Sequence, residues 1–203
     1  MFDMDKFWED IVKIFVDKVF IGILILLLGY LITKAIEKFK SEQAILKEYE
    51  TMRDKTALQH LQRQIEELYS PLLGLIQQSR IVYEVEQKKL PLKSTPEDFS
   101  KTKDYFIEKY YLPLNDEMAK LIRTKIYLLD ADEMPGSFHQ FLKHESQFAA
   151  LYNLWKDKGI RSDEIKGEKY PPSLENDVKN SLNSLRKRYN HYLKRLEIKL
   201  EEN

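Results

Sequence analysis

The feature that most constrains this chain is an uncharged run of 15 residues, 19–33, with the sequence VFIGILILLLGYLIT. At 1.5 Å per residue such a helix covers about 22 Å, less than the ~30 Å hydrocarbon core of a bilayer, so it must use its flanks. Including the apolar flanks, the expected span covers about residues 14–36. Each strongly apolar residue favours insertion by about 0.3–0.6 kcal/mol, which outweighs charges near the ends. We therefore expect one transmembrane helix.

Two other interpretations of this run fit less well. A cleaved signal peptide needs a basic start and a small-residue cleavage site, but no such site follows the run. The residues before it are also acidic, namely Asp3, Asp5, Glu9 and Asp10. A buried helix of a soluble core would carry its apolar residues on one stripe, whereas here Leu and Ile fall on every side.

The distribution of basic residues predicts the orientation of the span. Three lysines precede the run, and five basic residues follow it closely: Lys34, Lys38, Lys40, Lys47 and Arg53. Basic residues near the end of a span favour the cytoplasmic side. The absence of cysteine agrees with a reducing compartment. We expect a single-pass protein of the bacterial inner membrane, in contact with the lipid bilayer, whose C-terminal domain is cytoplasmic.

Two faces of this helix bear on self-association. Gly22 and Gly29 lie on one face, where small residues let neighbouring helices approach closely. A polar stripe lies roughly opposite and continues into three leucines: Lys6, Asp10, Lys13, Asp17, Leu24, Leu28 and Leu31. One interpretation is an interfacial helix with a solvated face. The other is a ring-like homo-oligomer in which Asp17 faces a wet lumen and the leucines form a constriction.

The remainder of the chain has the composition of long helices, with only 6 glycines and 7 prolines. We find no strand signal and no internal repeat. Capping and first-turn proline signals predict helix starts at Ser70-Pro71, Thr95-Pro96, Pro113, Ser137 (with Gln140) and Ser173. The sequence therefore predicts an all-α fold in which the transmembrane helix continues into a stalk and an antiparallel helical bundle. We divide the chain into a membrane-anchoring segment, residues 1–36, and a cytoplasmic bundle, residues 37–203.

Common catalytic motifs are absent: there is no phosphate-binding glycine loop, no pair of histidines four apart and no serine elbow. His139 and His144 share a helix but lie about 140° apart around it, so we interpret both as surface residues and expect no metal site. No cofactor is expected either. The 33 basic and 33 acidic residues cancel, so an anionic partner would need a local basic site.

One local basic site lies on the last predicted helix. Its apolar stripe is Val178, Leu182, Leu185, Tyr189, Leu196 and Leu200. His191 points about 150° away from the centre of that stripe and Arg186 about 70°. Together with Lys187, Lys194 and Arg195, His191 forms a basic outer face. That face could be plain solvated surface, a subunit interface or the binding surface for an anion such as RNA.

Arg186 and His191 form an Arg-x4-His pattern. It resembles the Arg-x4–6-His motif of the HEPN superfamily, small helical bundles whose active members cleave RNA where two motif copies meet at a dimer interface. The resemblance implies that Arg186 stabilises the phosphorane charge and His191 acts as general acid or base. Lys187 stands where active members carry a small polar residue or His. We therefore expect a structural role for the motif rather than catalysis.

The layout as a whole resembles the small membrane accessory protein of type VI-B CRISPR systems. Members of that family are HEPN-like, lie beside an RNA-guided RNA nuclease and assemble a membrane pore that strengthens antiviral defence. The resemblance implies a HEPN-like bundle, a pore-forming homo-oligomer, and RNA or the guided nuclease as partners. Two alternatives stay open: a membrane-tethered HEPN ribonuclease, and a structural tether that docks a partner protein.

Overall fold

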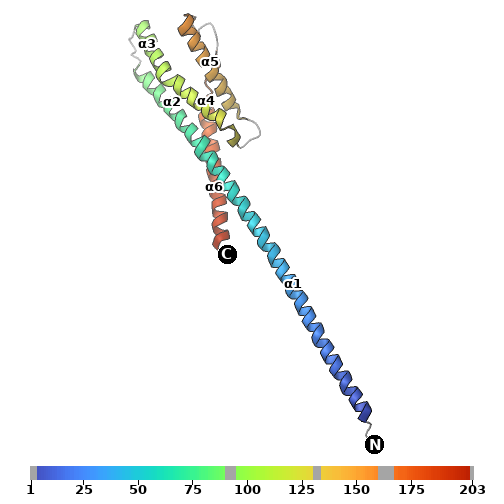
Figure 1. The fold of residues 1–203 in the computed structure, drawn as a ribbon. Helices are drawn as coiled ribbons and strands as arrows, with labels where there is room; N and C mark the ends of the chain where they lie inside the picture. The colour runs from blue at the N-terminus through green and yellow to red at the C-terminus, as the bar shows by residue number, and fades with distance from the viewer. Residues whose placement is uncertain (1–3, 90–94, 130–133, 160–166, 202–203) are drawn as a thin grey trace. The chain divides into compact units, whose positions relative to one another are not determined.

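The computed structural model describes residues 4–89, 95–129, 134–159 and 167–201. Within these ranges every regular element is a helix, which confirms the expected all-α class (Figure 1). The α-helices are α1 (Met4–Gln64), α2 (Ser70–Lys89), α3 (Pro96–Phe106), α4 (Leu112–Thr124), α5 (Gly136–Lys158) and α6 (Leu174–Glu201). The shorter elements are two π-helical turns, η1 (Ile65–Tyr69) and η2 (Ile107–Tyr111), and one 3-10 turn, η3 (Ile126–Leu128).

The chain divides into two compact units, Met1–Arg53 and Asp54–Asn203, which are described separately. The predicted division after residue 36 stays a prediction. The first unit consists of α1 up to Arg53.

In the first unit, an 18-residue stretch of α1 is apolar enough to cross a membrane, and none of it is buried. The large apolar side chains of residues 19–32 are between 45% and 75% exposed. The Thr33 hydroxyl donates to the Gly29 carbonyl at 2.9 Å, so this polar group is satisfied within the helix, as a bilayer requires. The Lys34 ammonium lies 5.9 Å from the centre of the Tyr30 ring. Both residue types favour membrane interfaces.

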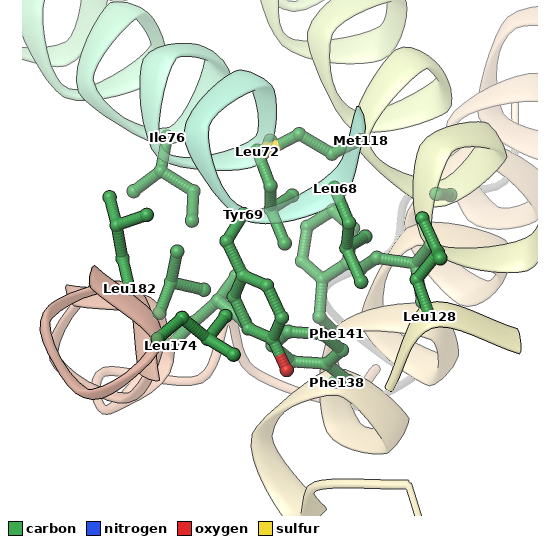
Figure 2. Close-up of a cluster of buried hydrophobic side chains, with 14 of the residues drawn as sticks. Leu68, Tyr69, Leu72, Ile76, Met118, Leu128, Phe138, Phe141, Leu174 and Leu182 are labelled. Atoms are coloured by element: carbon green, nitrogen blue, oxygen red, sulfur yellow. The ribbon is translucent and has the colours of Figure 1, made fainter. Parts of the chain in front are cut away.

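The second unit has one hydrophobic core, to which η1, α2, α4, α5 and α6 contribute (Figure 2). α2, the continuous helix formed by α3, η2 and α4, then α5 and α6 run in alternating directions (Figure 1). Phe138 and Phe141 are almost fully buried, and Tyr69 packs against Phe138 with 6.4 Å between ring centres. The predicted apolar stripe of α6 is confirmed for Val178, Leu182, Leu185 and Leu196, which are buried, and Tyr189, which is half-buried. The side chain of Leu200 lies outside the described residues.

α2 begins at Ser70 and ends at Lys89, as predicted, but the capping role predicted for Ser70 is wrong. The backbone on both sides of η1, at Gln64 and Ser70, is right-handed helical, so the helix continues through this point. The Ser70 amide donates to the Ile65 carbonyl, five residues back. Pro71 has no amide hydrogen, and in an α-helix its ring would clash with the carbonyl four residues back. A wider π turn just before Pro71 lets the helix continue past it.

α4 begins at Leu112, one residue before the predicted start at Pro113, and here too the helix continues from a π turn. The Leu112 amide donates to the Ile107 carbonyl, again five residues back, immediately before the proline. The two places share a short repeat that the sequence analysis missed: IEELYSPL at residues 65–72 and IEKYYLPL at residues 107–114. The common pattern is Ile-Glu-x-x-Tyr-x-Pro-Leu. We name it the π-turn repeat.

The remaining start signals had mixed outcomes. The Thr95 cap is confirmed, since its hydroxyl accepts from the Asp98 amide at 3.1 Å. The capping box at Ser137 is wrong: α5 begins one residue earlier, after Pro135. The Ser137 hydroxyl is buried and has no hydrogen-bond partner among the described residues. Ser173 directly precedes α6, as predicted.

Candidate functional site

The residues predicted for self-association lie on the exposed part of α1. A Cβ added at Gly22 or Gly29 would meet nothing within 4 Å in the chain. The leucines of the predicted constriction are exposed by 48% (Leu24), 51% (Leu28) and 56% (Leu31). The side chain of Asp17 lies outside the described residues. Whatever these side chains contact must therefore come from outside this unit.

Arg186 and His191 are both exposed on α6. The His191 ring lies 6.0 Å from the ring of Tyr192, its neighbour in the chain. Arg186 and His191 are five positions apart, so within one copy their side chains point about 140° away from each other around the helix. Neither lines the cavity described below. A single chain thus does not bring the motif together at one point.

The predicted basic face is only partly a free surface. Lys187 and Lys194 are exposed, but Arg195 is half-buried and its guanidinium lies 3.2 Å from the Asp54 carboxylate. Lys199 also reaches that carboxylate, at 2.9 Å. Asp54 is fully buried, so the two cations compensate a charge that would otherwise be costly to remove from water. The contacts of Asp54 with Arg195 and Lys199 therefore hold the start of the second unit against the end of α6.

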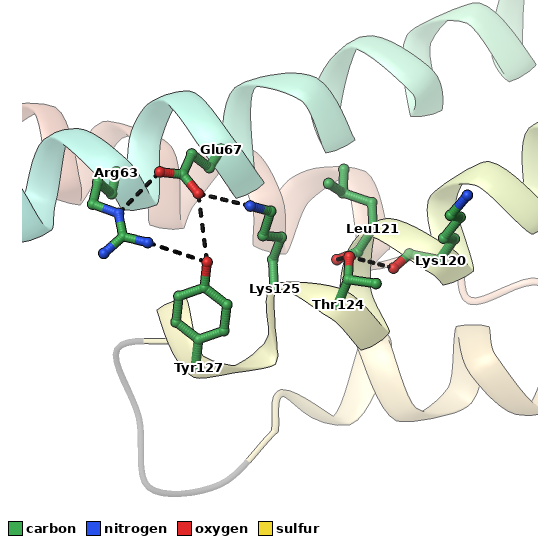
Figure 3. Close-up of polar contacts among 7 residues, drawn as sticks. All are labelled: Arg63, Glu67, Lys120, Leu121, Thr124, Lys125 and Tyr127. Carbon is green, nitrogen blue, oxygen red and sulfur yellow. Dashed lines mark hydrogen bonds and ion pairs between the residues drawn. The ribbon is translucent and has the colours of Figure 1, made fainter.

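A second polar cluster joins η1 to the segment after α4 (Figure 3). The Glu67 carboxylate accepts from Lys125 at 2.7 Å and from Arg63 at 2.9 Å. The Tyr127 hydroxyl accepts from Arg63 at 3.2 Å. Hydrogen bonds from Lys125 and Arg63 lower the pKa of Glu67 to about 2. The charges of this cluster are satisfied within it, so we interpret the cluster as a structural clamp, which holds η1 against the segment after α4.

The second unit also contains a partly open cavity of about 660 Å³. Its lining comes from α2, α3, η2, α4, α5, the segment leading into α6 and the first turn of α6. Within the described residues no group of three or more His, Asp or Glu is placed to hold a metal ion.

The buried part of the cavity lining is polar. Glu86 is 5% exposed, and its carboxylate accepts a hydrogen bond from the Tyr111 hydroxyl. Burial and the Glu86 charge raise the pKa of Tyr111 well above its usual value, so the phenol remains a donor. Asn115 is also 5% exposed, and no hydrogen bond joins its amide to another described residue. We name these three residues the polar floor.

One wall of the cavity is aromatic. The His144 ring stacks on Phe148, with 5.6 Å between ring centres and 21° between planes, and meets the edge of Tyr170 at 5.6 Å. His144 Nδ1 lies 2.8 Å from the Glu168 carbonyl. A carbonyl can only accept, so this nitrogen carries the hydrogen. His144 is half-buried at the wall of a partly open cavity, so the surface interpretation holds for it only in part, whereas His139 is exposed as predicted.

Cations lie at the outer part of the lining. Arg80 is 3.3 Å from the Glu84 carboxylate and 3.7 Å from that of Glu175. Glu175 has a lowered pKa because Lys179 hydrogen-bonds to it at 2.6 Å. Lys103 is exposed and has no ion pair with any other described residue. Two charged side chains of the lining, Lys103 and Glu86, form no ion pair with any other residue in the described part of the chain.

The fold defines a broad class: an all-α protein with one helix, among the described residues, that is long and apolar enough to span a membrane. No protein family, no curated protein and no solved structure matches the chain. Sequence reasoning missed the cavity residues Glu86, Tyr111, Asn115, His144 and Tyr170. Only Tyr111 carried a signal that could have been used, because it occupies the tyrosine position of the π-turn repeat.

Proposed function

We propose that this chain is a membrane-anchored, self-associating protein that forms a pore in, or perturbs, the bacterial inner membrane. The observation that supports this is the exposure of every large apolar side chain in residues 19–32. Contiguous apolar surface of this extent marks a membrane or protein contact, because leaving it in water is costly.

The arrangement of these side chains favours lipid over a partner protein. Leu24, Ile25, Leu26 and Leu27 are consecutive, cover a full helical turn and are all more than 45% exposed. A helix that docks on a soluble partner usually keeps one polar face. A helix that is apolar all round suits a bilayer.

Self-association is supported by the bare backbone at Gly22 and Gly29, which leaves room for a second helix. The proposed assembly is a ring in which Asp17 and the three leucines, roughly opposite the glycines, face the lumen. The resemblance in layout to type VI-B accessory proteins supports antiviral defence as its setting, with a HEPN-like bundle and an RNA-guided nuclease as partner.

The test is release of a fluorescent dye from liposomes that contain the purified full chain. We expect release that rises steeply with the protein-to-lipid ratio. Gly22→Leu combined with Gly29→Leu should abolish release and yield smaller species by light scattering in detergent. Ile25→Leu with Ile32→Leu is the matched control, since it has the same spacing and conserves volume. Absence of release from the wild type, or full release from the glycine variant, would contradict the proposal.

A second candidate is a membrane-tethered HEPN ribonuclease. The exposure of Arg186 and His191 on α6 favours it, because RNA or a second copy could reach both. We expect no RNA cleavage by the wild type in EDTA. Metal-independent cleavage that falls by about 10²–10⁴ in His191→Ala would favour the nuclease instead. A chain that neither cleaves RNA nor releases dye would fit the third candidate, a tether for a partner protein.

A further inference from the structure

The cavity of the second unit is separate from the surfaces considered so far. Its volume of about 660 Å³ lies within the range of small-molecule sites, about 300–1,000 Å³. Neither the Arg-x4-His residues nor the exposed apolar helix contributes to its lining. The polar floor, the aromatic wall and the outer cations therefore indicate which kind of ligand the cavity could bind.

The polar floor favours a ligand with hydrogen-bond donors. The Glu86 carboxylate has several acceptor positions, and Tyr111 occupies only one of them. Asn115 is 5% exposed as a residue and has no hydrogen-bond partner among the described residues, and its amide is not among the fully buried polar groups, so a ligand in the cavity could reach it. Buried polar groups in folded proteins are nearly always satisfied. A ligand edge carrying adjacent N–H donors would satisfy Glu86, while Asn115 could both donate and accept beside it.

The aromatic wall favours a ligand with a planar ring. Tyr83, His144, Phe148 and Tyr170 line the same cavity as the polar floor. The near-parallel stacking of His144 on Phe148 fixes both rings. Planar bases stack favourably on aromatic side chains, and they do so without a strong preference between bases.

The cations at the outer part of the lining favour a ligand that carries an anionic group. Lys103 has no opposite charge in contact within the described residues, and of the two carboxylates near Arg80, that of Glu175 is also bound by Lys179. Ammonium and guanidinium groups are the usual protein ligands of phosphate. A ligand with donors at one end, a flat ring and a phosphate at the other would therefore match all three parts of the lining.

We propose that this cavity binds a purine nucleotide, with the base on Glu86 and Asn115, its ring against the aromatic wall, and its phosphate at Lys103 and Arg80. Guanine is preferred over adenine. Its Watson–Crick edge presents two adjacent N–H donors to one carboxylate, whereas adenine places an acceptor next to its single amino group. The proposal does not depend on membrane insertion.

The experiment is calorimetric titration of the detergent-solubilised full chain with GMP, guanosine, AMP and tryptamine. We expect GMP to bind about tenfold or more tightly than AMP, the difference of one hydrogen bond to a charged group. Glu86→Gln keeps an acceptor for Tyr111 but should weaken GMP binding by about tenfold or more. Lys103→Ala should weaken GMP about two- to fivefold and leave guanosine unchanged.

Lys101→Ala is the matched control for Lys103, because Lys101 lies on the same helix, is paired with Glu97 at 2.9 Å and does not line the cavity. It should bind GMP as the wild type does. Thermal melting of each variant establishes that it is folded. Absence of GMP and AMP binding to the wild type would overturn the proposal, as would unchanged GMP affinity in folded Glu86→Gln. Binding of tryptamine in place of GMP would overturn it in favour of an organic cation.

Discussion

At the scale of single residues, Asp54 is the most deeply placed charge described in the second unit. Its side chain has no solvent exposure, and it contacts Arg195 and Lys199 from the far end of the sequence. A buried ion pair adds little net stability over an apolar replacement, but removing one partner leaves the others uncompensated. Asp54 is therefore a sensitive point for the fold.

Asp54→Asn should lower the free energy of unfolding of the second unit by about 2–3 kcal/mol, less than for a fully buried pair because Arg195 is partly exposed. The measurement is thermal unfolding in detergent followed by near-ultraviolet circular dichroism. Glu197→Gln makes the same chemical change at an exposed position of α6 and should stay within about 0.5 kcal/mol of wild type. Equal melting of the two variants would show that the Asp54 contacts do not contribute.

Glu67 predicts a pH dependence. Its folded pKa is about 2, below the ~4.3 of an unfolded glutamate, so the folded state binds the proton less tightly. The stability that it contributes is present above about pH 5 and is lost as the pH falls towards 2. The difference in stability between wild type and Glu67→Gln should therefore shrink over that interval.

Glu66→Gln is the control for this measurement, because the neighbouring Glu66 forms no ion pair with another described residue. Its effect at pH 7 should be smaller than that of Glu67→Gln. A Glu67→Gln difference that stays constant from pH 7 to pH 2 would contradict the clamp interpretation of Figure 3.

At the scale of elements, the two π turns decide which residues face the core. A π turn holds one residue more than an α turn, so it rotates the following helix by about 100° relative to an uninterrupted one. After η1, this rotation accompanies the full burial of Leu72 and the near-full burial of Ile76. The π-turn repeat sets a second such rotation before α4, where Leu114 and Met118 are buried.

Deleting Glu66 should remove the extra residue and leave an uninterrupted α-helix, which keeps the register of α2 but brings the Pro71 ring against the carbonyl four residues back. A proline in a helix interior costs about 3 kcal/mol or more. We expect loss of the cooperative thermal transition. Glu66→Ala removes the same side chain without shortening the helix and should melt close to wild type. A deletion variant that keeps the wild-type transition would show that the π turn is not needed to accommodate Pro71.

At the scale of the whole molecule, the expected topology is testable in cells. Because more basic residues follow the apolar run than precede it, residues beyond it should be cytoplasmic. Alkaline phosphatase fused after Asn203 should be inactive, and a fluorescent protein fused there should be bright. Changing Lys34, Lys38 and Lys40 to Gln should weaken this bias. An active phosphatase fusion to the unchanged chain would reverse the predicted orientation and exclude an intracellular RNA partner.

The sequence alone was sufficient for features that depend on neighbouring residues. The uncharged run at residues 19–33 predicted a transmembrane helix, and the structure has a helix there that is long and apolar enough to span a membrane. The spacing of Val178, Leu182 and Leu185 predicted the buried face of α6. Both follow from local composition and a period of 3.6 residues. The cap at Thr95 is local as well.

Only the tertiary structure decided the rest. Local preference makes Pro71 and Pro113 helix starts, but packing of Leu72 and Leu114 against the core keeps both helices continuous through a π turn. The cavity brings Glu86, Asn115 and His144 together from three different helices. Their spacing in sequence follows no period, because the contacts between helices, rather than the order of residues along any one of them, determine which polar groups share a space.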